Sequence, residues 1–130
     1  MIFAIKVEVR DPVRKIFVFD AQKTMYGGKQ IAQGDRIYLF ASENEGGPGL
    51  IARGLVTSAK AIARQTPRVS IVVKRTAHVK RRLGRGELKP FSNWNDGRPE
   101  TELNFKFYRQ ATNKIVGISG EAAAFLRESF

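Results

Sequence analysis

The clearest strand signal in the chain is the stretch GDRIYLFAS, Gly34 to Ser42. Gly34-Asp35 is typical of a tight turn, and the residues that follow alternate with a period of two. Successive side chains of a strand point to opposite faces of its sheet. We therefore expect one face formed by Ile37, Leu39 and Ala41, and another formed by Tyr38, Phe40 and Ser42.

Further elements are expected on both sides of this stretch. Period-two patterns predict strands over residues 2–9, 15–20, the first half of 49–62, 68–76, 103–107 and 115–118. Residues 80–98 carry three glycines and a proline without a clear period, so we expect a long loop there. Ser119 can cap a final helix over residues 120–129, and Glu121 in its first turn suits the helix dipole.

This set of elements predicts the fold class. Six or seven short strands in one flat sheet would leave exposed edges, and a curled barrel removes them. We therefore expect an α+β fold, a small mixed β-barrel with a flanking helix or helices. The chain has 130 residues, of which 42% are hydrophobic, which is enough for one apolar core. We expect a single domain over residues 1–130.

The composition excludes several classes of protein. The chain has no Cys and one His, which excludes a disulfide scaffold, a thiolate site and a histidine-rich metal site. No run of about 18 apolar residues occurs, so no membrane-spanning helix is supported. We expect a soluble, cytoplasmic protein without a metal or another cofactor.

The distribution of charge indicates an anionic partner. The net charge is +11, and no acidic residue occurs between Glu45 and Glu87. That interval contains ten basic residues: Arg53, Lys60, Arg64, Arg68, Lys74, Arg75, Lys80, Arg81, Arg82 and Arg85. Nucleic-acid phosphates are the commonest partners of such a surface. The run lacks the apolar face that a helix at a membrane surface needs, so a membrane partner is not expected.

The end of this basic run also offers groups that could hold a base. Aromatic faces and a few polar groups bind an unstacked base, while Lys and Arg hold the flanking phosphates. The candidates for the base pocket are Trp94 as a stacking wall, Asn93 and Ser42 as polar readers, and Tyr26 and Phe40 near the barrel mouth. The candidates for phosphate contacts are Arg75, Lys80, Arg81, Arg82 and Arg85. The alternative for Trp94 is a packing role in the core or the loop.

Catalytic motifs are sparse in the sequence. His78 lies among basic residues, which disfavour the imidazolium that a general base must become. The acid pairs Glu43 with Glu45 and Glu100 with Glu102 fall in or near expected loops, and this spacing alone does not define a metal site. We therefore expect no catalytic residue, and the sequence favours a binding protein over an enzyme.

Two segments resemble a known group of folds. The first is Gly34 to Ser42 with the following GLIARGLVTS, and the second is IVGISGEAAAFL, Ile115 to Leu126. Both resemble the PUA-like superfamily, most closely its EVE branch, which is related to the YTH and ASCH domains. The resemblance implies a small β-barrel that reads a modified base in DNA or RNA. It also implies that Ser42 and Trp94 border the base pocket.

Three functions remain open from the sequence. The leading hypothesis is a non-enzymatic domain that binds DNA or RNA, with a base in a pocket and phosphates on a basic rim. The second is a small hydrolase acting on a modified nucleoside, with Lys23, Thr24 and Glu43 in the roles that the resemblance suggests. The third is a module whose basic face binds an acidic protein, with ATNK, residues 111–114, and the last helix with Phe130 as the docking face.

Overall fold

The computed structural model describes residues 2–63, 66–110 and 113–130. The strands are β1 Ile2–Val7, β2 Ile16–Met25, β3 Arg36–Ala41, β4 Gly49–Ile62, β5 Arg68–His78 and β6 Lys114–Ile118. The helices are η1 Gly28–Gln30, η2 Glu43–Glu45, α1 Arg85–Leu88, α2 Pro99–Asn104, η3 Phe105–Gln110 and α3 Gly120–Arg127. Of these, η1 and η2 are single 3₁₀ turns, and η3 is a π-helix that continues α2.

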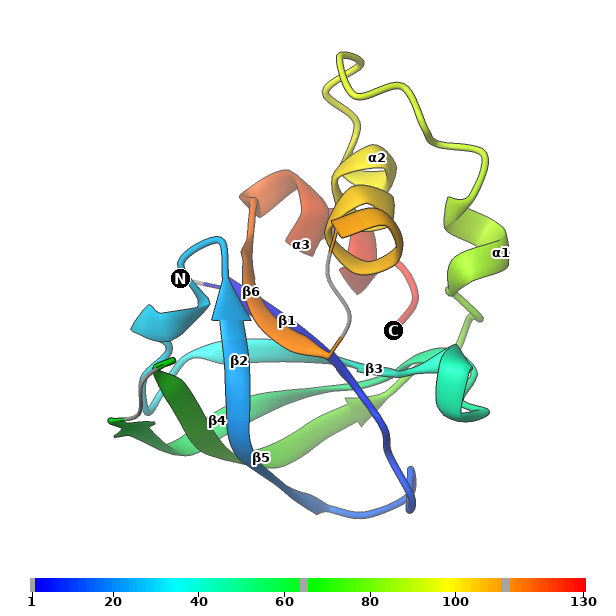
Figure 1. The fold of residues 1–130 in the computed structure, drawn as a ribbon. Helices are drawn as coiled ribbons and strands as arrows, with labels where there is room; N and C mark the ends of the chain where they lie inside the picture. The colour runs from blue at the N-terminus through cyan, green and yellow to red at the C-terminus, as the bar shows by residue number, and fades with distance from the viewer. Residues whose placement is uncertain (1, 64–65, 111–112) are drawn as a thin grey trace.

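The strands close into a mixed barrel in the order β1-β3-β4-β5-β2-β6 (Figure 1). Strand β1 pairs in parallel with β3 and antiparallel with β6. Strand β2 closes the barrel by pairing antiparallel with β5 and in parallel with β6. The expected mixed β-barrel is confirmed.

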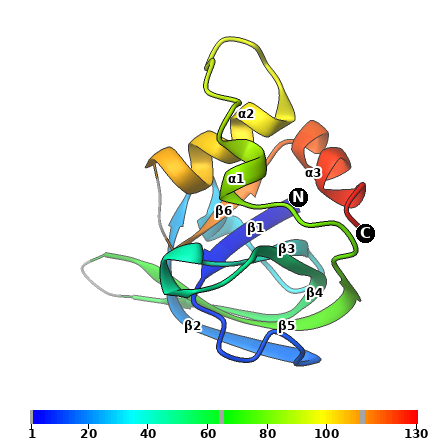
Figure 2. The same cartoon turned by 90° about the vertical axis from the view of Figure 1, so that its right-hand side faces the viewer.

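The two faces that the sequence pattern predicts for β3 are both buried from Ile37 to Ala41. Ile37 and Leu39 belong to the apolar cluster inside the barrel. Tyr38 and Phe40 belong to a second cluster, which lies between the outside of the barrel and the helices. The helices α1, α2 and α3 lie together on one side of the barrel (Figures 1 and 2). The outward face of β3 is therefore part of the core and does not meet solvent.

The segment 103–107 is helical, and the strand predicted there is wrong. We expected a strand, but Leu103 lies in the last turn of α2 and Phe107 lies in η3. Leu103 and Phe107 are four residues apart and both are buried, which is the spacing of one helix face. Phe105 between them points to another side, where it contacts Trp94. The alternation of apolar residues was thus a helical pattern.

The other elements differ from the expectations mainly in their bounds. Strand β4 runs through the whole of Gly49–Ile62, and β2 continues to Met25. The expected loop over 80–98 contains the short helix α1. Helix α3 is capped as expected, because the Ser119 hydroxyl accepts a hydrogen bond from the Ala122 amide. In the described residues, no helix is both long enough and apolar enough to cross a membrane.

Candidate nucleic-acid interface

Trp94 stands at a pocket in the loop that connects α1 and α2. Its side chain is 56% exposed, and its ring meets the Phe105 ring edge-on with 4.7 Å between the centroids. The guanidinium of Arg109 lies 5.3 Å from the indole centroid. The pocket has a volume of 280 Å³ and is lined by Trp94, Gly97, Arg98, Thr101, Glu102 and Phe105. A half-exposed indole at a pocket offers aromatic surface on which a base can stack.

Local hydrogen bonds hold this loop against the start of α2. Asp96 accepts from the Arg98 amide at 3.0 Å and from the Thr101 hydroxyl at 3.0 Å. The side-chain amide of Asn104 donates to the Phe91 carbonyl at 2.9 Å. The loop segment that carries Trp94 is therefore tied to α2 at both of its ends.

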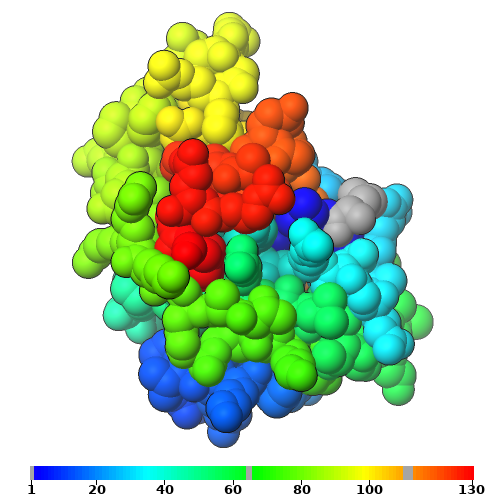
Figure 3. Space-filling view, turned by 180° about the vertical axis from the view of Figure 1, so that it is seen from behind, coloured from blue at the N-terminus to red at the C-terminus, as the bar shows by residue number. Residues whose placement is uncertain are grey.

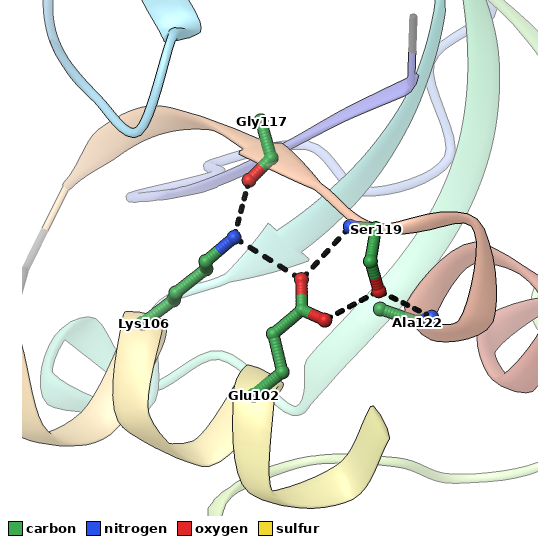
Figure 4. Close-up of polar contacts among 5 residues, drawn as sticks. All are labelled: Glu102, Lys106, Gly117, Ser119 and Ala122. Atoms are coloured by element: carbon green, nitrogen blue, oxygen red, sulfur yellow. Dashed lines mark hydrogen bonds and ion pairs between the residues drawn. The ribbon is translucent and has the colours of Figure 1, made fainter. Parts of the chain in front are cut away.

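Glu102 lines the same pocket and connects it to the rest of the fold (Figure 4). Its carboxylate accepts from the hydroxyl and the amide of Ser119, which caps α3, and from Lys106 Nζ at 3.1 Å. Lys106 also donates to the Gly117 carbonyl of β6 at 2.7 Å. Burial would raise the pKa of Glu102, but the hydrogen bonds from Ser119 and Lys106 outweigh it and the pKa is lowered. The pocket therefore contains a carboxylate that stays ionised.

The other predicted base-pocket residues lie on different sides of η3. Four consecutive residues of this helix contact them or their neighbours: Phe105 contacts Trp94, Lys106 contacts Tyr26, Phe107 contacts Phe40, and Tyr108 contacts Glu43 beside Ser42. Consecutive helical residues point in directions roughly 80–100° apart. The structure thus brings Trp94 and Asn93 together as chain neighbours, but it does not bring Ser42, Tyr26 or Phe40 to them.

The exposure of three of these residues, Phe40, Tyr26 and Asn93, differs widely. Phe40 is completely buried, and its ring packs on Phe107 with 4.7 Å between centroids. It is a core residue in this structure and presents no face to a base. Tyr26 is 40% exposed, with Lys106 Nζ 4.8 Å from its ring centroid. Asn93 is exposed, and its side chain accepts from the Asn95 amide at 3.3 Å.

Ser42 is buried beside a compact polar cluster. Its hydroxyl has no hydrogen-bond partner in the part of the chain that the structure describes. Next to it, Glu43 accepts from the Tyr108 hydroxyl at 2.9 Å and from the Arg85 amide at 2.6 Å. The ammonium of the buried Lys6 donates to the Phe107 carbonyl at 2.6 Å. Burial lowers the pKa of Lys6, and burial together with Glu43 raises that of Tyr108.

This cluster also bears on the hydrolase alternative. Glu43 is held by Tyr108 and Arg85, on the helical side of the barrel. Lys23 and Thr24 lie on β2, where they pair with β6. Glu43 and the Lys23-Thr24 pair therefore have different neighbours, and no described contact joins them into one site. Within the described ranges, no three acidic or histidine residues gather where they could hold a metal ion.

The five predicted phosphate contacts divide into two groups. Arg75 donates from Nη1 to the Val13 and Arg14 carbonyls, each at 2.7 Å, so its guanidinium holds the loop before β2. Arg85 likewise donates to the Asn44 side chain at 2.8 Å. Lys80, Arg81 and Arg82 are exposed, and the amides of the first two bind the Ser129 carbonyl. Figure 3 shows this green segment beside the red C-terminal helix.

Comparison with known proteins supports the fold. No family model and no curated protein matches the sequence. The human THYN1 protein, crystallised in complex with 5-methylcytosine-containing DNA, is 13% identical with a TM-score of 0.70, over 98% of this chain and 95% of the chain in that structure. The DUF55 domain of human thymocyte nuclear protein 1 is 11% identical with a TM-score of 0.67, over 98% and 97% of the two chains.

A third structure agrees with these two. A hypothetical protein from Leishmania major is 20% identical with a TM-score of 0.64, over 98% of this chain and 93% of that one. All three likenesses extend over nearly the whole chain, so they concern the complete barrel and its helices. The chain therefore shares its fold with these DUF55-type structures, and the small β-barrel that the resemblance implied is confirmed.

Proposed function

We propose that this protein binds nucleic acid without catalysis and holds one unstacked base against Trp94. The observation that carries the proposal is the exposed indole at the mouth of a 280 Å³ pocket. Pockets for small ligands start at about 300 Å³, so this volume suits a ligand of the size of a single base. The net charge of +11 supports an anionic chain as the partner.

One polar group of the pocket, the Glu102 carboxylate, suits a cytosine. Carboxylates accept hydrogen bonds from the exocyclic amine of cytosine. Glu102 is ionised because its pKa is lowered, and it lines the pocket beside Arg98 and Thr101. The structurally similar THYN1 protein was crystallised with DNA containing 5-methylcytosine. We infer that a modified cytosine in DNA is the first ligand to test.

Replacing Trp94 by alanine is expected to weaken binding of a single-stranded oligonucleotide with one 5-methylcytosine by about 5- to 150-fold. Loss of one base–aromatic stack costs about 1–3 kcal/mol. The wild type should show quenching of its single indole on titration, more with 5-methylcytosine than with cytosine. RNA of the same sequence in a parallel titration tests the choice of nucleic acid.

The matched control is Val18→Ala, which shortens another exposed apolar side chain, on β2, and should bind like the wild type. Trp94→Phe should retain most of the affinity, because it keeps an aromatic face. Oligonucleotide binding that leaves the indole signal unchanged and tolerates Trp94→Ala would remove the base pocket from the proposal.

Arg81→Gln is expected to change the salt dependence of binding, and Arg75→Gln is expected to change the stability of the fold. Arg81 is exposed, so its loss should leave stability unchanged and lower the slope of log K against log salt by about 0.7 for a single strand. Arg75 holds two carbonyls, so its loss should destabilise the fold by about 1–2 kcal/mol. Titrations at several salt concentrations and urea unfolding separate these effects. An unchanged salt slope in Arg81→Gln would show that this residue contacts no phosphate.

A further inference from the structure

A second pocket brings together three arginines from separate elements. Arg36 begins β3, Arg53 lies in β4, and Arg127 ends α3. These residues line a cavity of 320 Å³ together with Tyr38, Leu55 and Thr76. It shares no described lining residue with the Trp94 pocket.

The arginines of this pocket have no carboxylate partner among the residues that the structure describes. None of the described lining residues is acidic. In the described ranges, none of the three guanidiniums forms an ion pair with a carboxylate. Gathering like charges around one cavity raises the free energy of the folded state unless an anion enters. The arrangement therefore favours an anionic ligand.

The position of Arg53 is fixed by aromatic packing. Its guanidinium lies 5.2 Å from the Phe130 ring centroid, and the Phe130 ring packs on Tyr38 with 5.8 Å between centroids. Burial raises the pKa of Tyr38, and the charges of Arg53, Arg127 and Arg36 oppose that rise. The three cations thus lie near enough to Tyr38 to influence its hydroxyl, which donates to the Ala123 carbonyl at 3.4 Å. An arginine that is already oriented loses less conformational freedom when it binds.

We propose that the Arg36–Arg53–Arg127 pocket is a phosphate-binding site. Guanidinium groups bind phosphate through paired N–H donors, and the converging cations match a group with several oxygens and more than one charge. The phosphate is either a terminal phosphomonoester or a phosphodiester within a nucleic-acid strand. The site does not depend on the base pocket, since the two cavities are built from different residues.

The first test uses inorganic phosphate as the probe, with sodium chloride balancing the ionic strength. Phosphate is expected to raise the unfolding temperature of the wild type and to shift the Nε–Hε NMR signals of Arg36, Arg53 and Arg127. Arg53→Gln and Arg127→Gln should each weaken the phosphate affinity about 10- to 150-fold, the effect of one charge-assisted hydrogen bond. Arg10→Gln removes the same charge from a residue paired with Glu8 and should respond like the wild type.

The second test separates the two sources of phosphate. If the ligand is a terminal phosphate, the wild type should prefer a 5′-phosphorylated oligonucleotide over its 5′-hydroxyl form, and Arg53→Gln should lose that preference. If it is an internal phosphodiester, Arg53→Gln should weaken both oligonucleotides equally. Either result supports the site. An equal response of Arg10→Gln and Arg53→Gln to phosphate, or no response of the wild type, would overturn it.

Failure of this site is distinguishable from failure of the base pocket. Trp94→Ala should keep the full response to inorganic phosphate, because Trp94 does not line the arginine pocket. Arg53→Gln should keep the base-dependent quenching of Trp94 at saturating oligonucleotide. A Trp94→Ala variant that loses the phosphate response would contradict the independence of the two pockets.

Discussion

Phe40→Ala is expected to lower the free energy of unfolding by about 3–5 kcal/mol, the usual cost of removing a buried phenylalanine ring. Phe40 is completely buried and packs on Phe107, between the outside of the barrel and the helices. Its loss leaves a cavity at the contact between β3 and η3. Urea unfolding followed by circular dichroism measures the change.

Trp94→Ala is the matched comparison, since it also removes a large aromatic ring. Because Trp94 is 56% exposed, its loss should cost about 1 kcal/mol or less. Phe40→Leu should recover most of the stability lost in Phe40→Ala. If Phe40→Ala and Trp94→Ala destabilise the fold equally, then the assignment of Phe40 to the core and of Trp94 to an exposed pocket is wrong.

The barrel could be predicted from the sequence because its strands are strongly patterned. In β3, Ile37 and Leu39 alternate with Tyr38 and Phe40, and both sets are buried. That pattern gives the two faces of the strand directly. It does not say that the outward face meets helices, so it left Phe40 as a candidate for a pocket.

The helices on that face were harder to predict because the pattern of Leu103, Phe105 and Phe107 fits a strand and a helix equally well. A start signal for a helix was nevertheless present. Pro99 occupies the first turn of α2, followed by Glu100 and Glu102, and both features are typical of a helix N-terminus. The resemblance placed Trp94 and Ser42 at one pocket, whereas η3 separates their contacts.

The role of Glu102 could not be predicted from the sequence, because its partner Ser119 is seventeen positions away. The sequence shows Ser119 as a helix cap and Glu102 as an acid near a loop. Only the packing of α2 against α3 makes one carboxylate accept from that cap and from Lys106 (Figure 4). One residue therefore connects the pocket to α3 and, through Lys106, to β6.

Glu102→Ala is expected to destabilise the fold by about 2–4 kcal/mol, somewhat below the roughly 3–5 kcal/mol for breaking a fully buried ion pair. The side chains of Lys106 and Glu102 are 15% and 21% exposed, so solvent screens the pair only partly. Glu100→Ala on the same helix is the control and should change stability by less than about 0.5 kcal/mol. Equal effects of the two variants would show that the contacts of Glu102 contribute little.

The effect of Glu102→Ala should also depend on pH in one direction. The pKa of Glu102 is lower in the folded protein than its ordinary value of 4.5, so the unfolded state binds the proton more tightly. Its contribution to stability is therefore complete above about pH 5 and is lost as pH falls through the folded pKa. The difference in unfolding free energy between wild type and variant should shrink from pH 7 to pH 3. Because other carboxylates titrate equally in both proteins, a difference that stays constant over this range would mean that packing of the side chain, and not its charge, stabilises the contact between α2 and α3.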